Sequence, residues 1–152
     1  MTQDLINKID SAMNPIPSIN LRGIPANDSQ IIDAQNELNV VFHDDYITFI
    51  KIFGGAYAGL PIYAFENNDM MTNQTIVDLT KSFREDYIDD KRSEILNESY
   101  VISFDGGGNP ILVDSSERVL IFYHDNDEYK VFASSFSEFI EKAINKEYEN
   151  EW

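Results

Sequence analysis

Three short stretches of the sequence hold residue types that could carry chemistry. The first, DGGGNP at residues 105–110, places three glycines between an acid and a proline. Glycine-rich loops can bind phosphate through their backbone N–H groups, but a P-loop needs a lysine and a hydroxyl residue after its last glycine. Asn109 and Pro110 stand there, and Ile111 occupies the position of the third glycine of a dinucleotide fingerprint. We therefore predict a hairpin turn, with Asp105 bonded to turn amides.

The second stretch, HDNDEYK at residues 124–130, has the alternating acids of a calcium-binding loop. Counted from Asp125, however, Lys130 occupies the position of the turn glycine, and Ala133 and Phe136 stand where later ligands belong. An EF-hand is therefore excluded, and only a weak divalent site is compatible with the pattern. The chain has two histidines, no cysteine and no HExxH motif, so no zinc site is predicted either.

The third feature is that each histidine precedes an aspartate, as His43-Asp44 and His124-Asp125. Such pairs can assist a nucleophile, but a GxSxG motif and a cysteine nucleophile are both missing. With 27 acids, pairs of carboxylates like those of glycoside hydrolases must occur by chance, and their presence has no diagnostic value. We predict no catalytic residue and no cofactor. A hydrolase that uses Asp, Glu and His around His124 is a remote alternative.

The elements that position these stretches follow from hydrophobic periodicity. Apolar residues three and four apart predict helices over about three turns from residue 5, from Asn27 or Asp28 to about Asn39, over 46–53 and over 74–87. The third of these ends at Gly54 and Gly55. Residues 60–65 are β-branched and aromatic enough for a strand, and the charged segment 84–99 is predicted to lie on the surface with partial helix.

After residue 99 the hydrophobic period changes to two. The runs SYVISF, PILVD, RVLIFYH and EYKVFA predict four strands of a meander. A closing helix opens at Ser134 or Ser135, and Ser135 has capping-box spacing to Glu138. This order predicts a single α+β domain over residues 1–152, with a mostly antiparallel sheet of about four to six strands flanked by N-terminal helices and a closing C-terminal helix.

The formal net charge of −16 is the strongest feature of the composition. Nucleic-acid binding requires Lys and Arg against the phosphates, and only 11 such residues oppose 27 acids, so no nucleic-acid partner is predicted. No stretch is apolar for long enough to cross a membrane, and the N-terminus has no secretory signal, so we expect a cytoplasmic protein without a membrane partner. An acidic surface attracts basic partners, but charge alone does not name one.

Four blocks of the chain, in order between residues 37 and 144, resemble the SUKH superfamily, which includes Smi/Knr-type cell-wall regulators and many bacterial toxin-immunity proteins. The blocks are ELNVVFHDDYITFIKIFGG, VISFDGGGNPILVD, VLIFYHDND and FASSFSEFIEKAI. They are similar to the family's helix with Gly-Gly, its acid-plus-glycine hairpin, its aromatic strand ending in His-Asp, and the start of its closing helix. The residues expected to serve this shared structure are Gly54, Gly55, Asp105, Gly106, Gly107, Gly108, His124 and Phe136.

The chain also departs from the family pattern. Phe42 and His43 replace the usual leucine-proline before Asp44, and Asn109 replaces an acid that is common after the glycines. These departures place the chain in a divergent branch, from which neither subfamily nor partner can be transferred.

The resemblance implies an α+β domain that serves as a protein-binding surface, which in bacterial members usually means neutralising a cognate toxin, often a nuclease. We therefore predict an immunity protein, a monomer or weak dimer, that binds a basic toxin domain. An adaptor of the same fold that scaffolds cell-wall or signalling proteins is the alternative. The predicted contacts are five acids and two aromatic anchors: Asp89, Asp90, Asp125, Asp127, Glu128, Tyr57 and Tyr63. Trp152, at the last position, is expected to be frayed.

Overall fold

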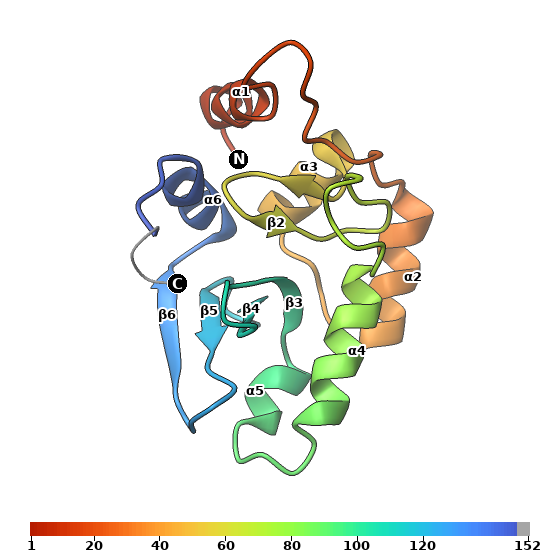
Figure 1. The fold of residues 1–152 in the computed structure, drawn as a ribbon. Coiled ribbons are helices and arrows are strands. Elements are labelled where there is room, and N and C mark those ends of the chain that lie inside the picture. Colours follow the sequence, from red (N-terminus) through yellow and green to blue (C-terminus); the bar gives the residue numbers. More distant parts are fainter. Residues whose placement is uncertain (149–152) are drawn as a thin grey trace.

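The computed structural model describes residues 1–148, in which helices come first and a meander with a closing helix follows (Figure 1). The elements are α1 (Gln3–Ala12), α2 (Asp28–Leu38), α3 (Asp44–Phe53), β1 (Ala56–Tyr57), β2 (Pro61–Ile62), α4 (Ile76–Asp86), α5 (Ser93–Asn97), β3 (Tyr100–Phe104), β4 (Pro110–Val113), β5 (Val119–Phe122), β6 (Tyr129–Ala133) and α6 (Phe136–Ile144). The predicted α+β class is confirmed. Trp152 lies outside the described residues, so its predicted fraying stays a prediction, as does the single-domain assignment over the whole chain.

The helices begin and end where local chemistry favours it. Asn27 caps α2 in a reciprocal box, because its side chain accepts a hydrogen bond from the Gln30 N–H and the Gln30 side chain accepts one from the Asn27 N–H. Gly54 ends α3 with a φ of 68°. A Cβ atom at Gly54 would lie 2.3 Å from the backbone oxygen of Ile24, so both conformation and space require glycine there.

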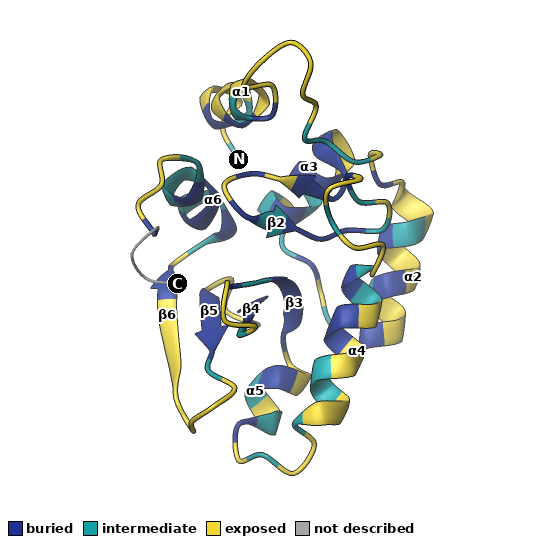
Figure 2. Cartoon of the chain, in the orientation of Figure 1, coloured by how far each residue is buried: buried dark blue, intermediate teal, exposed yellow. Residues whose placement is uncertain are grey.

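The meander has the predicted strand order, β3-β4-β5-β6, with every neighbouring pair antiparallel. Helices cover both faces of this sheet, and its inner strands are therefore buried along their whole length (Figure 2). On one face, Leu112 and Leu120 pack with Leu79 of α4 and Leu96 of α5. The opposite face packs into the larger core that α1, α2, α3 and α6 supply. This double burial explains why the strands read as nearly continuous apolar runs.

Two local predictions need correction. The strand expected over residues 60–65 is only two residues long, because the backbone beyond Ile62 bonds elsewhere: the Tyr63 N–H donates to the Ile102 oxygen at 2.9 Å. At α6, the Ser135 hydroxyl accepts a hydrogen bond from the Glu138 N–H as predicted, but the Glu138 carboxylate accepts from the N–H and hydroxyl of Ser134 rather than from Ser135. Within residues 1–148, no helix has the length and apolar character needed to span a membrane.

Candidate functional site

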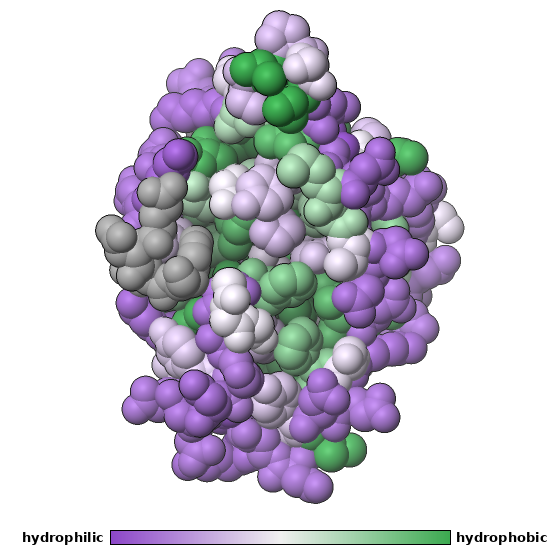
Figure 3. All heavy atoms as spheres, viewed as in Figure 1, coloured by the Kyte–Doolittle hydropathy of each residue, from purple (hydrophilic) through white to green (hydrophobic). Residues whose placement is uncertain are grey.

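Two acidic segments of the chain meet at one end of the molecule, where the connection from α4 to α5 lies against the β5–β6 turn. Within this surface, which we call the acidic end, the carboxylates belong to Asp86, Asp89, Asp90, Asp125, Asp127 and Glu128. Lys91 bridges the two segments through an ion pair with Asp127 at 2.8 Å. In Figure 3, hydrophilic residues cover the part of the molecule where Figure 1 places these segments. Five of the predicted contact residues are thus brought together by the fold.

A buried arginine joins the two segments. The Arg92 side chain is 5% exposed, and its guanidinium donates to the backbone oxygens of Tyr123 at 2.7 Å and Glu128 at 2.6 Å. It also donates to both carboxylate oxygens of Asp90 at 3.0 Å and lies 3.7 Å from the ring centroid of Phe122. A buried cation is tolerated only with such partners. Arg92 therefore fixes the backbone of the β5–β6 turn relative to the α4–α5 connection.

The role predicted for Asp90 does not fit its position. The hydrogen bonds from Arg92 lower the pKa of the Asp90 carboxyl to about 2, and the side chain is only 17% exposed. Asp90 thus serves the fold as the counter-ion of Arg92 rather than presenting its charge to a partner. Sequence reasoning missed Arg92 itself, although an arginine inside a strongly acidic run is a signal that an internal ion pair is needed.

The other acids of this surface point to solvent. Asp89, Asp125 and Glu128 are exposed, and their side chains form no ion pair within the described part of the chain. Asp127 and its partner Lys91 are both about two-thirds exposed, so that pair is weak. The unpaired carboxylates are therefore available to a cationic surface.

Tyr87 is a half-buried residue of the acidic end. Burial raises the pKa of its hydroxyl, and the charges of Asp86, Asp90 and Asp125 raise it further against the opposing charge of Arg92. Acids from both segments thus act on one hydroxyl, and the Lys91–Asp127 ion pair joins the same two segments. The ring of Tyr87 packs edge-on against Phe122, with ring centroids 4.9 Å apart.

Two exposed apolar side chains accompany the acids, and sequence reasoning did not select them as contacts. Ile88 is 71% exposed immediately after Tyr87, and Tyr129 is 44% exposed at the start of β6. Ile88 falls outside the apolar stripe of α4, which runs through Leu79 and Phe83 to Tyr87. An apolar residue off that stripe was the signal in the sequence for an exposed side chain. An apolar group ringed by polar ones is a common arrangement for an interface anchor.

The two tyrosines predicted as anchors lie elsewhere. Tyr57 is 38% exposed on β1, which Figure 1 shows on the side of the N-terminal helices. The prediction that Tyr63 is a surface anchor is wrong, because its side chain is only 2% exposed and its ring stacks on Phe104 with centroids 5.5 Å apart. Its backbone oxygen also accepts a hydrogen bond from the buried Tyr46 hydroxyl at 2.7 Å.

The glycine-rich stretch is a hairpin turn whose acid is used internally. One Asp105 oxygen accepts hydrogen bonds from the N–H groups of Gly107 at 2.9 Å and Asn109 at 2.8 Å, and the other accepts from the Asn109 side chain. The predicted bonding of Asp105 to turn amides is confirmed. Of the three glycines only Gly108 has a positive φ, of 84°, so Gly106 and Gly107 are not required by backbone conformation.

His124 contacts this turn from the β5–β6 connection, through an amide rather than a carboxylate. Its backbone N–H and its ring Nδ1 both contact the Asn109 side-chain oxygen. Since that oxygen is an acceptor, Nδ1 carries the proton and bonds an amide rather than a carboxylate. Among residues 1–148, no group of three or more His, Asp or Glu side chains is placed to hold a metal ion.

Phe136 and the glycines after α3 have structural surroundings, as expected. The Phe136 ring packs edge-on against Tyr46 and Phe49, at centroid distances of 5.6 and 5.5 Å. A Cβ atom at Gly55 would lie 1.9 Å from the side-chain oxygen of Asn67, so only glycine fits without rearrangement.

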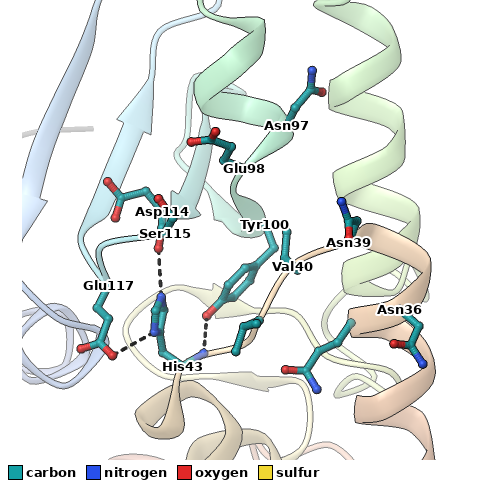
Figure 4. Close-up of a pocket in the computed structure, with 12 residues that line it drawn as sticks. Asn36, Asn39, Val40, His43, Asn97, Glu98, Tyr100, Asp114, Ser115 and Glu117 are labelled. Carbon is teal, nitrogen blue, oxygen red and sulfur yellow. Dashed lines mark hydrogen bonds and ion pairs between the residues drawn. The ribbon is translucent and has the colours of Figure 1, made fainter.

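A polar cleft of about 750 Å³ lies between the C-terminal end of α2 and the β4–β5 turn (Figure 4). His43 forms part of its wall: ring Nδ1 lies 3.0 Å from a Glu117 carboxylate oxygen, and ring Nε2 lies 2.9 Å from the Asp114 backbone oxygen. The sequence had paired His43 with the adjacent Asp44, whereas the structure pairs it with a residue 74 positions away.

A model of the SMI1 / KNR4 family (SUKH-1) matches residues 25–142, which include every element from α2 to β6 and most of α6. That match covers well over half of the chain, and it includes all four sequence blocks that carried the resemblance apart from the last two residues. No curated protein matches the chain detectably. This protein belongs to the SMI1 / KNR4 family (SUKH-1).

Proposed function

We propose that this protein is a cytoplasmic immunity protein that binds and neutralises a basic bacterial toxin domain through its acidic end. Membership of the SMI1 / KNR4 family (SUKH-1) is consistent with an immunity-type, protein-binding domain. The observation that carries the proposal is the convergence of two acidic segments, 86–90 and 125–128, held together by Arg92.

The charge distribution favours a cationic partner. A net charge of −16 attracts positive surfaces over distances comparable to the Debye length, which raises association rates. At the acidic end, the unpaired carboxylates of Asp89, Asp125 and Glu128 add a local field that directs a partner's Lys and Arg side chains to this surface.

The structure of this surface also suits tight binding. Because Arg92 already fixes the turn, little backbone order has to be gained when a partner docks. Ile88 and Tyr129 supply apolar area among the charges, and such anchors contribute much of the free energy of binding at interfaces.

Neutralisation needs no catalytic step. A toxin that acts on nucleic acid must hold phosphates against Lys and Arg, and an acidic protein that covers those side chains blocks the substrate. His124, the centre of the alternative hydrolase site, is bonded to the Asn109 amide of a structural turn. We accordingly assign the protein a binding role.

A growth assay tests the proposal. Each toxin domain encoded beside this gene is expressed in a sensitive bacterium with and without this protein, and at least one of them is expected to be neutralised. If the protein protects against none of these toxin domains, the proposal is wrong. Capture of a cell-wall or signalling protein from the native organism, with no toxin captured, would instead favour the adaptor role.

The ionic strength dependence of binding tests the electrostatic part separately. For a toxin that is neutralised, the association rate should fall about tenfold or more between low salt and 0.5 M salt. An association rate that does not change with salt would show that the acids do not steer the encounter.

A further inference from the structure

The polar cleft beside His43 is a second surface with a definite chemical character. Figure 4 shows Glu98, Ser115 and Glu117 along one side, Asn36 and Asn39 across from them, and Tyr100 between the two sides. The cleft therefore brings together the ends of α2 and α5, the start of β3 and the β4–β5 turn.

Internal contacts hold the walls of the cleft in place. On one side, the Arg84 guanidinium donates to the backbone oxygens of Leu38 at 2.8 Å and Ser99 at 3.0 Å, which joins the end of α2 to the start of β3. On the other side, one Asp114 carboxylate oxygen accepts hydrogen bonds from the backbone N–H groups of Ser116 and Arg118 at 3.0 and 2.9 Å. A site whose walls are fixed before binding loses little entropy when a ligand enters.

His43 connects the β4–β5 turn to the rest of the cleft. Its ring contacts the Asp114 backbone oxygen and one Glu117 carboxylate oxygen, and its backbone N–H donates to the Tyr100 hydroxyl at 3.0 Å. The second Glu117 oxygen has no partner within residues 1–148, and the Glu117 side chain is 64% exposed. Glu117 is thus oriented by His43 but still presents charge to the cleft.

The lining is acidic and rich in amides. Its carboxylates and amides belong to Glu98, Glu117, Asp114, Gln35, Asn36, Asn39 and Asn97, and no Lys or Arg is among the lining residues. Within the described part of the chain, the side chains of Glu98, Asn36, Asn39 and Asn97 form no hydrogen bond. Among the lining carboxylates, Asp114 is neutralised by an ion pair with Arg118 at 2.7 Å, whereas Glu98 and the second oxygen of Glu117 remain available as acceptors.

The cleft also has an apolar part. Val41 is 78% exposed and Val40 is half-buried, and both line the cleft. A long side chain with an aliphatic stem and a cationic head matches this combination, because the stem can cover the valines while the head bonds the carboxylates. Arginine fits better than lysine, since its planar group offers five N–H donors to several acceptors at once.

We propose that this cleft binds an arginine side chain of the partner protein, with the guanidinium on the acidic side that Glu98 and Glu117 line and the stem on Val40 and Val41. This inference rests on the proposed function, because it assumes a basic protein partner, and it adds a contact that lies apart from the acidic end. The partner would then be held at two surfaces, one that attracts it through a broad field and one that recognises a single residue.

A peptide titration tests this cleft without a known partner. The probe is acetyl-Gly-Arg-Gly-amide, added to ¹⁵N-labelled protein, and the control is the same peptide with neutral citrulline in place of arginine. The arginine peptide should give saturating amide shifts at residues 39–41, 98–100 and 115–117, with a dissociation constant on the order of 1–10 mM, as expected for one side chain. The citrulline peptide should not saturate.

Matched variants separate the two surfaces. In the double variant Glu98→Gln with Glu117→Gln, the dissociation constant of the arginine peptide should rise at least about fivefold, as loss of a charge-assisted hydrogen bond predicts. The double variant Asp125→Asn with Asp127→Asn should leave that dissociation constant unchanged. The ¹⁵N spectrum of each variant shows whether it is folded. If the double variant of Glu98 and Glu117 does not fold, the single variant Glu98→Gln replaces it in the titration.

The outcomes are distinct. Shifts confined to residues 86–89 and 125–128, or no saturating shifts at all, would overturn the cleft assignment while leaving the growth assay to decide the proposed function. Equal binding of the citrulline peptide would also overturn it, because the charge would then contribute nothing. Conversely, a failed growth assay with intact arginine binding at the cleft would reject the toxin as partner and leave the arginine site standing.

Discussion

Two acidic turns, β3–β4 and β5–β6, lie side by side at the same end of the meander and use their carboxylates in opposite ways. In the β3–β4 turn, Asp105 is 8% exposed and accepts three hydrogen bonds from its own turn. In the β5–β6 turn, Asp125 and Glu128 are exposed, and the buried Arg92 side chain donates hydrogen bonds to the backbone of the turn. His124 connects the two turns through Asn109.

The difference shows that a sequence motif does not tell whether its carboxylate is free to contact a partner, because that depends on the hydrogen bonds the carboxylate already accepts in the fold. The glycine-rich turn looks more like a binding site in sequence, but its acid has its acceptor capacity taken up by the fold. The β5–β6 turn leaves its carboxylates to solvent, because its backbone is held by Arg92 and by the turn's own bonds, from the Tyr123 N–H to the Glu128 oxygen and from the Glu128 N–H to the Asn126 side chain. The exposed carboxylates of the β5–β6 turn, and not the acid of the glycine-rich turn, are therefore the ones accessible to a partner.

The largest effect is expected from removing that arginine. Arg92→Met leaves Asp90 without its counter-ion and removes the Arg92 donor from the Tyr123 and Glu128 oxygens, of which the Glu128 oxygen keeps its bond from the Tyr123 N–H, so the free energy of unfolding should fall by about 3–5 kcal/mol. Urea denaturation measures it. Lys91→Met, which removes only the exposed pair with Asp127, is the control and should change stability by less than about 1 kcal/mol. Similar losses in the two variants would break the distinction between scaffold and surface.

The second prediction compares the acids of the two turns directly. Asp105→Ala removes a buried acceptor of three hydrogen bonds and should cost about 2–3 kcal/mol. Asp125→Ala should lie within about 0.5 kcal/mol of the wild type, because its side chain is exposed. Chemical denaturation of both variants under one condition checks this, and the reverse order would refute the comparison.

The third prediction concerns the glycines of the β3–β4 turn. Gly108→Ala should destabilise by about 1–2 kcal/mol, since its φ of 84° strains a residue with a Cβ atom even though nothing lies within 4 Å of that atom. Gly106→Ala meets no neighbour and needs no positive φ, so it should be neutral or slightly stabilising. Thermal unfolding of the pair isolates backbone conformation from packing, and equal effects would contradict this account of the turn.

The smallest effect is expected from acid titration of the Arg92 contact. Since the folded-state pKa of Asp90 is about 2, below its ordinary value of 3.8, the unfolded chain binds more protons between these values. The stabilisation from this contact is complete above pH 4 and is lost as the pH falls towards 2. Asp90→Asn should therefore lose less stability over this window than the wild type, by on the order of 1 kcal/mol. Parallel curves from urea denaturation between pH 2 and 5 would contradict it.

Much of the fold follows from the sequence because its signals are local. Asn27 caps a helix with a residue three positions away, and Asp105 bonds groups two and four positions away, so both were predictable. The meander was equally clear, because alternating apolar runs with short turns leave few other pairings.

The candidate site was harder to predict because its key contacts join distant parts of the chain. Arg92 bonds the backbone 31 and 36 positions away, and His43 bonds Glu117 across 74 positions. No local pattern encodes such pairs. Tyr63 was misplaced for a related reason: its burial depends on Phe104 and Tyr46, which only the folded chain brings to it.

We propose that the acidic end, rather than the overall charge, recognises the partner. The most direct test is the growth assay with two charge-matched triple variants. One carries Asp89→Asn, Asp125→Asn and Asp127→Asn, and the other carries Asp33→Asn, Glu66→Gln and Asp69→Asn at exposed positions away from the acidic end. Each has three fewer acids and hence a net charge of −13 in place of −16.

Against a toxin that the wild type neutralises, the first variant should lose protection and the second should keep it. Equal protection by both variants, or equal loss in both, would contradict the assignment of partner binding to the acidic end.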